Sequence, residues 1–399
     1  MTTNRTALVG AHVVPITSEP LNDATVLIAD GKIEAVGDSR LEIPADTEIV
    51  DVTGRWVLPG FVDAHTHIGT LEDGEGWAGD DHDEGTEPVT ARLRALDAIN
   101  PADIAFRDAV AGGVLSVGVN PGSCNPIGGQ SVALRTFGRT VDDMVLRQPC
   151  GLKSALGENP KKAYGDQGKM PSTRMGIAAV IRQALARARD YDKHNTSESA
   201  VDLDLEVIAR VLRGEIPWRQ HVHRADDIAT ALRLADEFGY QLVIDHGTEA
   251  AGLADILAAR QIPVVLGPLI VGRAKSELRH RSLRTAGLLA AAGVRISIAT
   301  DHSVVPIQFL VHQATLAVKE GLDPVTALEA LTINPAAVLG VDDRLGSLET
   351  GKDADLCVWS GDPLDVMQRV ESAYIQGRRI YHYDHEKRVG QFDGHTWTP

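Results

Sequence analysis

Eight short apolar segments alternate with helical segments between residues 58 and 346, and this alternation is the strongest constraint on the fold. One of the intervening segments, "DDIATALRLADEFG", carries apolar residues at helical spacing and ends at Gly239. Eight strand–helix units predict an α/β protein, a (β/α)8 or TIM barrel, over residues 58–346. The predicted strands are 60–67, 114–120, 131–137, 150–157, 218–223, 241–246, 262–267 and 295–300.

The two ends of the chain have a different texture, with short β-branched runs between turn residues. In "IADGKIEAVG" the pair Asp30-Gly31 predicts the tip of a β-hairpin. The tail returns to the same texture in "GSLETGKDADLCVWSG". We therefore expect residues 1–57 and 347–399 to join in one small β-sandwich that flanks the barrel.

The amino-acid composition limits the kinds of molecule that we expect the protein to bind. The chain has 399 residues, of which 43% are hydrophobic, and a net charge of −16. A surface of this charge repels phosphate backbones and anionic lipids, so we expect neither nucleic acid nor membrane as a partner, but a small-molecule substrate. No run approaches the roughly 18–20 apolar residues of a membrane span. Three scattered cysteines favour the cytoplasm. The sequence is compatible with a homo-oligomer.

Metal-type side chains recur at the ends of the predicted strands. In "LPGFVDAHTHIG", His65 and His67 share one face of the first strand, because side chains two apart in a strand point the same way. His221, His246 and Asp301 follow at the ends of the fifth, sixth and eighth predicted strands. Barrel active sites lie at this rim, and imidazoles aimed at one point can bind a metal. The alternative for a single HxH pair is two hydrogen-bonded core histidines.

A family resemblance runs along nearly the whole chain. The motifs are weak singly and specific together in this order: "GKIEAVG", "LPGFVDAHTHIG", "HVHRADDI", "IDHGTEA", "ATDHS", "LTINPAAVLG" and "GSLETGKDADLCVW". The chain resembles the amidohydrolase superfamily, and within it the imidazolonepropionase-like branch. The resemblance implies a barrel with a β-sandwich, one or two divalent metal ions and metal-activated water.

The resemblance also implies residue roles. His65 and His67 would hold the more buried metal ion, and His221 and His246 a second ion or the substrate. Asp301 would bind metal and relay the proton as general acid and base, with His246 as the other catalytic residue. Zinc is the first expectation for the metal, with iron, manganese and cobalt as alternatives.

The fourth predicted strand leaves two alternatives for a further ligand. Glu158 in "GENP" stands at the strand end, where a glutamate would bind metal directly. Lys153 reaches the rim from mid-strand and would bridge two metal ions if it were carboxylated, as in much of the superfamily. A bridging anion favours two metal ions, whereas a terminal ligand permits one.

Residues near the same rim are candidates for substrate contact. We expect His223, Asn125 and Arg273 to contact substrate; Lys275 is the alternative to Arg273 for clamping a substrate carboxylate. Residues 71–88 contain eight acidic side chains and one tryptophan. This segment is either a lid that favours a cationic substrate or a solvated loop.

The sequence thus predicts a metal-dependent hydrolase acting on C–N bonds other than linear peptide bonds. Expected substrates are a cyclic amide, an N-acyl amide or a peptide-like amide. The alternatives are an aminohydrolase (deaminase) or a metal-dependent lyase or decarboxylase. Deaminases of the family often have an acid three residues after the fifth-strand histidine, where this chain has Arg224. A non-enzymatic scaffold would not need five metal-type ligands.

Overall fold

A computed structural model describes residues 5–194 and 200–393, and two sheets organise it. All eight predicted barrel segments overlap a strand of the second sheet, in which sequential strands are neighbours. These strands are β6 (Phe61–Thr66), β7 (Val114–Val119), β8 (Ile127–Arg135), β9 (Val145–Ala155), β10 (Trp218–Val222), β11 (Leu242–His246), β12 (Val264–Leu266) and β13 (Ile296–Ile298).

The eight-stranded sheet curves until its two edges nearly meet. Past the end of β13, the Asp301 amide donates to the His65 carbonyl at 3.1 Å. The next residue after Asp301, His302, accepts at its carbonyl from the His67 amide at 2.8 Å. These bonds join β6 to the segment after β13, so the predicted α/β barrel is confirmed in its general form.

Strand β8 departs from the predicted alternation, because it runs antiparallel to both β7 and β9. Residues 120–126 are the whole connection from β7 to β8. A parallel crossover needs a dozen or more residues, whereas a short connection suits an antiparallel neighbour. The (β/α)8 pattern is therefore wrong at this strand, although the strand itself was predicted.

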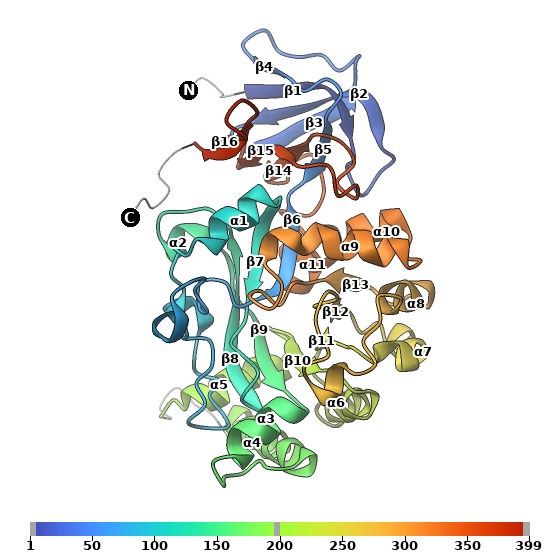
Figure 1. Cartoon of the computed structure of the whole chain (residues 1–399). Helices are drawn as coiled ribbons and strands as arrows, with labels where there is room; N and C mark the ends of the chain where they lie inside the picture. The colour runs from blue at the N-terminus through green and yellow to red at the C-terminus, as the bar shows by residue number, and fades with distance from the viewer. Residues whose placement is uncertain (1–4, 195–199, 394–399) are drawn as a thin grey trace.

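Helices cover the outside of the barrel (Figure 1). Helix α6 has buried Ile228, Ala231 and Leu232 on one face and ends at Gly239, whose φ of 78° lies in the left-handed region, as its sequence predicts. The helices are α1 (Ala105–Ala111), α2 (Val141–Met144), α3 (Glu158–Gly165), α4 (Arg174–His194), α5 (Leu203–Leu212), α6 (Ala225–Phe238), α7 (Ala254–Ala259), α8 (Thr285–Ala291), α9 (Leu310–Lys319), α10 (Pro324–Glu329) and α11 (Ile333–Leu339).

Both ends of the chain contribute to the other sheet, drawn in blue and red above the barrel in Figure 1. Its order is β17-β16-β15-β14-β5-β1-β2-β3, and β4 also pairs with β1. The predicted hairpin turns at Asp30 and Gly31, which both have positive φ. The strands are β1 (Arg5–Val13), β2 (Leu21–Ala29), β3 (Lys32–Asp38), β4 (Glu48–Asp51), β5 (Trp56–Pro59), β14 (Leu356–Trp359), β15 (Val370–Ile375), β16 (Arg378–Asp384) and β17 (Val389–Phe392).

The union of the two chain ends is thus a hydrogen-bonded sheet, in which β5 pairs antiparallel with β14. Its description as a sandwich, and the boundaries 1–57, 58–346 and 347–399, stay predictions. Residues 1–4 and 394–399 of the predicted terminal domain lie outside the described residues.

The barrel interior changes from apolar to polar along its strands. Val62 of β6, Val243 of β11 and Val265 of β12 pack in one cluster with Leu339 of α11. Two residues after Val243 in β11, the inward-facing position is occupied by the charged residue Asp245. Since side chains two apart share a strand face, the apolar layer supports a polar layer toward the carboxyl ends of the strands.

A buried network of ion pairs connects β8 of the barrel to the segment just before β14 of the terminal sheet. Arg135 donates from Nε to Asp355 at 2.7 Å and from Nη2 to Asp353 at 2.6 Å. All three side chains are at least nine-tenths buried. A buried pair that loses one partner leaves an uncompensated charge in a low-dielectric surrounding.

We expect Arg135→Met to lower the free energy of unfolding by about 3–5 kcal/mol, the cost typical of breaking a buried pair. Urea denaturation followed by circular dichroism measures this change. Arg182→Met is the matched control, because Arg182 pairs with Glu237 at the surface and should give a much smaller change. Equal effects of the two variants would contradict the structural role of Arg135.

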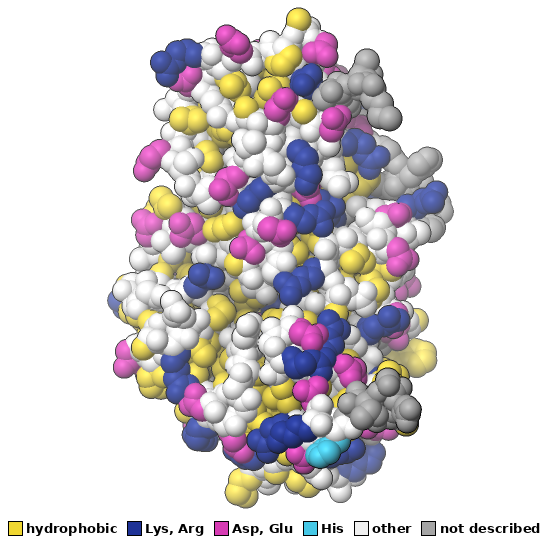
Figure 2. Space-filling model, turned by 180° about the vertical axis from the view of Figure 1, so that it is seen from behind, with side chains coloured by type: hydrophobic (Ala, Val, Ile, Leu, Met, Phe, Trp, Pro, Cys, Tyr) yellow, Lys and Arg dark blue, Asp and Glu magenta, His cyan; other side chains and the backbone are white. Residues whose placement is uncertain are grey.

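The surface mixes charges of both signs, as on the face in Figure 2. Surface arginines are held by neighbouring carboxylates; Arg213, for example, contacts Glu215 and Asp192 at 2.6 Å each. The three cysteines are free. Among the described residues, no helix has the length and apolar character needed to cross a membrane.

Candidate metal centre

His65 and His67 lie at the carboxyl end of β6, as predicted. His65 is 1% exposed and His67 is 8% exposed. Their ring centroids are 5.5 Å apart. The Nδ1 atom of His67 is 2.8 Å from the Asn120 carbonyl oxygen, to which it can donate. This bond leaves Nε2 as the ring nitrogen of His67 that faces Asp301, 3.3 Å from its Oδ1 atom.

His246 is the last residue of β11, and Asp301 follows β13 at the same end of the barrel. Both residues have left-handed backbone, with φ of 72° at His246 and 53° at Asp301. This conformation is uncommon for residues other than glycine and is often found at functional sites. The Nδ1 atom of His246 lies 2.8 Å from the Gly267 carbonyl oxygen, which orients its ring.

One group of potential ligands consists of His65, His246 and Asp301, with their candidate atoms all within 4.8 Å of one another. The Oδ1 atom of Asp301 lies 3.4 Å from Nε2 of His65 and 3.3 Å from Nε2 of His67. Both ring nitrogens of His65 are buried without a hydrogen bond. Converging nitrogen and oxygen donors with an unsatisfied buried nitrogen fit a divalent cation.

A second group consists of His221, His223 and His246, again within 4.8 Å. The ring of His221 lies 4.4 Å from that of His246, and the ring of His223 lies 4.9 Å from it. The Nδ1 atom of His221 is buried without a partner, whereas Nδ1 of His223 lies 2.8 Å from Oγ1 of Thr248. His246 therefore belongs to both groups.

Burial keeps these imidazoles neutral. It lowers the pKa of His246 to about 3 and the pKa values of His221 and His223 well below the usual range. Burial would raise the pKa of Asp301, but His246 and the contacts with His65 and His67 outweigh it and hold that pKa well below its usual range. Neutral imidazoles and an ionised carboxylate are the forms that bind metals.

Of the two alternatives near the fourth strand, Lys153 faces the histidines. Its side chain is fully buried on β9, and Nζ donates to the Pro121 carbonyl at 3.3 Å. Burial lowers its pKa, and its charge in turn lowers the pKa values of His221 and His246. Glu158 begins α3 and belongs to neither ligand group. Its neighbour Asn159 instead has Nδ2 3.5 Å from Nε2 of His221.

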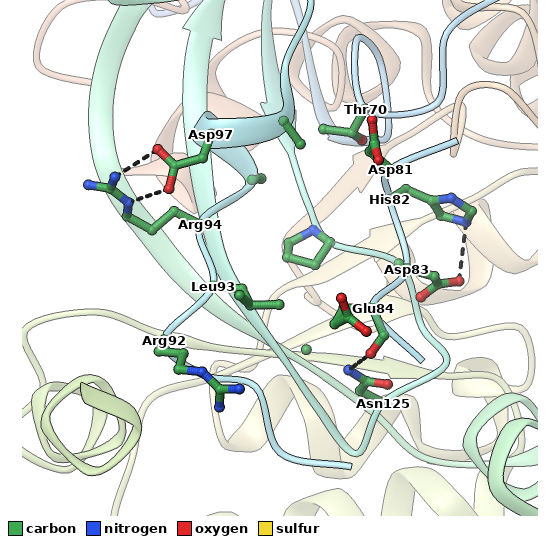
Figure 3. A pocket seen from close by; sticks show the side chains of 15 residues that line it. Thr70, Asp81, His82, Asp83, Glu84, Arg92, Leu93, Arg94, Asp97 and Asn125 are labelled. Carbon is green, nitrogen blue, oxygen red and sulfur yellow. Dashed lines mark hydrogen bonds and ion pairs between the residues drawn. The ribbon is translucent and has the colours of Figure 1, made fainter. Parts of the chain in front are cut away.

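A cavity of about 280 Å³ lies on the His67 side of the site, and its lining includes Thr70, Asp81 and Asn125 (Figure 3). His82 lines it, and the His82 ring lies 5.3 Å from the ring of His67. The arginines in its wall are already paired, Arg94 with Asp97 and Arg92 with Asp204. The acidic segment 71–88 contributes four residues to this wall: Asp81, His82, Asp83 and Glu84.

The three predicted substrate contacts have different surroundings. His223 joins the second ligand group, as described. Asn125 lines the cavity at 3% exposure, but its amide already bonds Glu84, Thr90 and Tyr164. Arg273 is exposed and donates to the Arg279 carbonyl. Lys275 instead donates to Oδ1 of Asn159 at 3.0 Å, beside His221.

Sequence reasoning missed several residues of the site. His82 stands in the acidic segment 71–88, which was interpreted as either a lid or a solvated loop without assigning His82 to the site. Asp63 accepts from the amides of His65 and Thr300 and so joins the two edges of the barrel. The alternation within "FVDAHTH" did not reveal this, since the bond spans 237 residues. Arg219 stands two before His221, and this spacing could have identified it as inward-facing.

Comparison with known proteins places the chain in a family. Residues 152–380, more than half of the chain, match the amidohydrolase family. The chain belongs to the amidohydrolase family. It is 46% identical to a crystal structure of an amidohydrolase from Thermotoga maritima, with a TM-score of 0.91 and coverage of 94% of this chain and 100% of the other.

Two sequence relatives extend this result. The chain is 30% identical to an imidazolonepropionase from Porphyromonas gingivalis, over 84% of this chain and 82% of that protein. It is 28% identical to amidohydrolase tasK from Hapsidospora irregularis over 88% of this chain, but spans only 39% of that longer protein. The relatives support a hydrolase acting on C–N bonds and confirm the resemblance noted from the sequence motifs.

Proposed function

We infer that the chain is a metal-dependent amidohydrolase that cleaves a C–N bond in a cyclic, N-acyl or peptide-like amide. The observation that carries this proposal is the group of His65, His246 and Asp301 at the carboxyl ends of three separate strands. Family membership supports the reaction class. The convergence of metal-type ligands supports the mechanism.

His65, His67, His246 and Asp301 would hold the first ion, most simply Zn²⁺, although such donors also suit iron, manganese or cobalt. A bound divalent cation supplies hydroxide at neutral pH by lowering the pKa of water. Asp301 is the general base that takes the proton from water and the general acid that delivers it to the leaving nitrogen. His246, the other proposed catalytic residue, stays neutral beside it and acts as a ligand of the ion.

His221 and His223 would bind a second ion or the substrate. A bridging anion would favour a second ion, and carboxylated Lys153 is better supported as such a bridge than Glu158 is as a terminal ligand, because Glu158 belongs to neither ligand group. The neutral amine favoured by the buried surroundings of Lys153 is the form that reacts with carbon dioxide. Metal analysis together with mass spectrometry under non-denaturing conditions tests both alternatives, because carboxylation adds the mass of carbon dioxide to Lys153.

Charges at the two sides of the cluster favour an amino-acid-like amide. Lys275 offers a cation next to Asn159 and His221 that suits a substrate carboxylate. On the other side, Asp81 and Glu84 of the cavity suit a cationic group. Arg273 and Asn125 contribute indirectly in this proposal, since their polar atoms are already engaged by protein groups.

A substrate screen tests the proposed reaction. Zinc-loaded protein and a chelator-treated control are given matched cyclic amides, N-acyl amino acids and dipeptide-like amides. The expected products are an amine and a carboxylate, formed only with metal. Release of ammonia or of carbon dioxide instead would identify a deaminase or a decarboxylase, and metal-independent turnover would contradict the mechanism.

We expect Lys275→Met to raise KM about 10–100-fold for substrates with a free carboxylate, the effect of losing one charge-assisted hydrogen bond of about 1.5–3 kcal/mol. The same variant should leave KM unchanged for the amide-capped form of the substrate. Lys161→Met, on the exposed side of α3, is the matched control. A KM change that is equal for both substrate forms would remove Lys275 from carboxylate binding.

A further inference from the structure

We propose that the buried ion pair of Asp245 and Arg219 positions His65 for metal binding and so sets the affinity of the centre for its ion. The inference rests on the proposed function, since it concerns a ligand of the proposed metal site. Neither residue belongs to the two ligand groups, and neither has a part in the proposed proton transfers.

Asp245 stands directly behind His65. Its Oδ1 atom lies 3.3 Å from Nδ1 of His65, on the side of the ring opposite to Asp301. Both side chains are buried, with Asp245 fully so. A carboxylate in this position favours the tautomer that carries hydrogen on Nδ1. The Nε2 lone pair is then free on the side where Asp301 and His246 converge.

Arg219 fixes Asp245 in turn. Its Nη2 donates to Oδ1 of Asp245 at 2.6 Å, and its Nε lies 3.2 Å from both carboxylate oxygens. The same Nη2 donates to the carbonyl of Ala64, the residue before His65, at 2.9 Å. One guanidinium group of β10 therefore connects β11 and β6 next to the ligand. This connection restricts both the backbone and the ring of His65.

A purely structural role does not explain this pair well. The neighbouring interior layer is filled with hydrocarbon, as at Val62 and Val265. Burying two charges is costly, and well-packed apolar residues often replace a buried ion pair without loss of stability. The ion pair is explained if the Asp245 carboxylate orients and polarises His65 as a metal ligand. Substituting a residue that hydrogen-bonds a metal ligand typically weakens metal binding by about 10–100-fold.

The test is the zinc affinity of the purified full chain, measured by competition with a chromophoric chelator. We expect Asp245→Asn to raise the Kd for Zn²⁺ by about 10–100-fold. Because this variant leaves Arg219 unpaired, the double variant Asp245→Leu, Arg219→Leu is measured as well. It removes both charges, should fold, and should bind zinc as weakly as Asp245→Asn.

Asp355→Asn is the matched control, since it breaks the buried pair with Arg135 far from the histidines. It should lower the melting temperature and leave the zinc Kd within about twofold. The visible spectrum of Co²⁺-substituted protein gives a second readout: we expect it to change in the two Asp245 variants and not in Asp355→Asn.

The outcomes separate the two proposals. Unchanged zinc affinity and an unchanged Co²⁺ spectrum in a folded Asp245 variant would overturn the positioning role and leave the proposed function intact. Failure of the unaltered protein to bind any divalent ion would instead overturn the proposed function, and the inference with it.

Discussion

Asp301→Asn is expected to retain the fold while reducing kcat by about 10²–10⁴, the usual contribution of a general acid–base group. Asparagine has nearly the same shape as aspartate but cannot accept the proton of the attacking water. The surroundings hold the pKa of Asp301 well below its usual range, so the carboxylate is ionised at neutral pH. Steady-state kinetics on the first substrate found by the screen would measure the loss.

Two controls define this result. Circular dichroism should match the unaltered protein, which separates lost chemistry from lost structure, and kcat is compared at equal metal content, established by metal analysis. Asp343→Asn, an equivalent change at an exposed position, should leave kcat unchanged. Full turnover by Asp301→Asn would remove Asp301 from the mechanism.

His65→Ala is expected to yield protein with almost no bound metal. It removes one of the converging donors and leaves a buried space with fewer ligands than a tightly held divalent ion requires. We expect His67→Ala to act in the same direction, because His67 also faces Asp301. Inductively coupled plasma mass spectrometry on protein purified without chelators measures the metal-to-protein ratio.

His12→Ala serves as the control, since His12 packs against Trp56 in the terminal sheet, with the ring centroids 4.2 Å apart and the rings tilted by 48°. This variant should keep the metal content of the unaltered protein. If His65→Ala and His67→Ala also kept it, the HxH pair would have a structural role only.

Strand positions were predictable from the sequence because hydrophobic runs and turn residues act locally. The segments 218–223 and 241–246 match β10 and β11 within one residue at each end. Gly239 ended its helix as predicted, because the left-handed C-cap is a local requirement. Strand direction was not predictable in this way. An antiparallel β8 and a parallel one have the same apolar pattern, and only the short connection 120–126 distinguishes them.

For the site, ligand type and strand-end position predicted which side chains would meet. His65, His246 and Asp301 do converge, although their roles stay predictions. Side-chain reach was harder to predict. Sequence order gave no means to decide between Lys153 and Glu158, or between Arg273 and Lys275. Those choices depend on how α3 and the segment after β12 pack, which involves contacts between residues more than a hundred positions apart.

The order of the terminal sheet has a consequence for biosynthesis. Strand β5 is made early, yet its partner β14 is made about 300 residues later. At typical translation rates of about 5–20 residues per second, the edge of β5 waits roughly 15–60 s on the ribosome before it can pair. An open strand edge invites pairing with other chains. The nascent protein therefore depends on that edge staying protected until the last strands emerge.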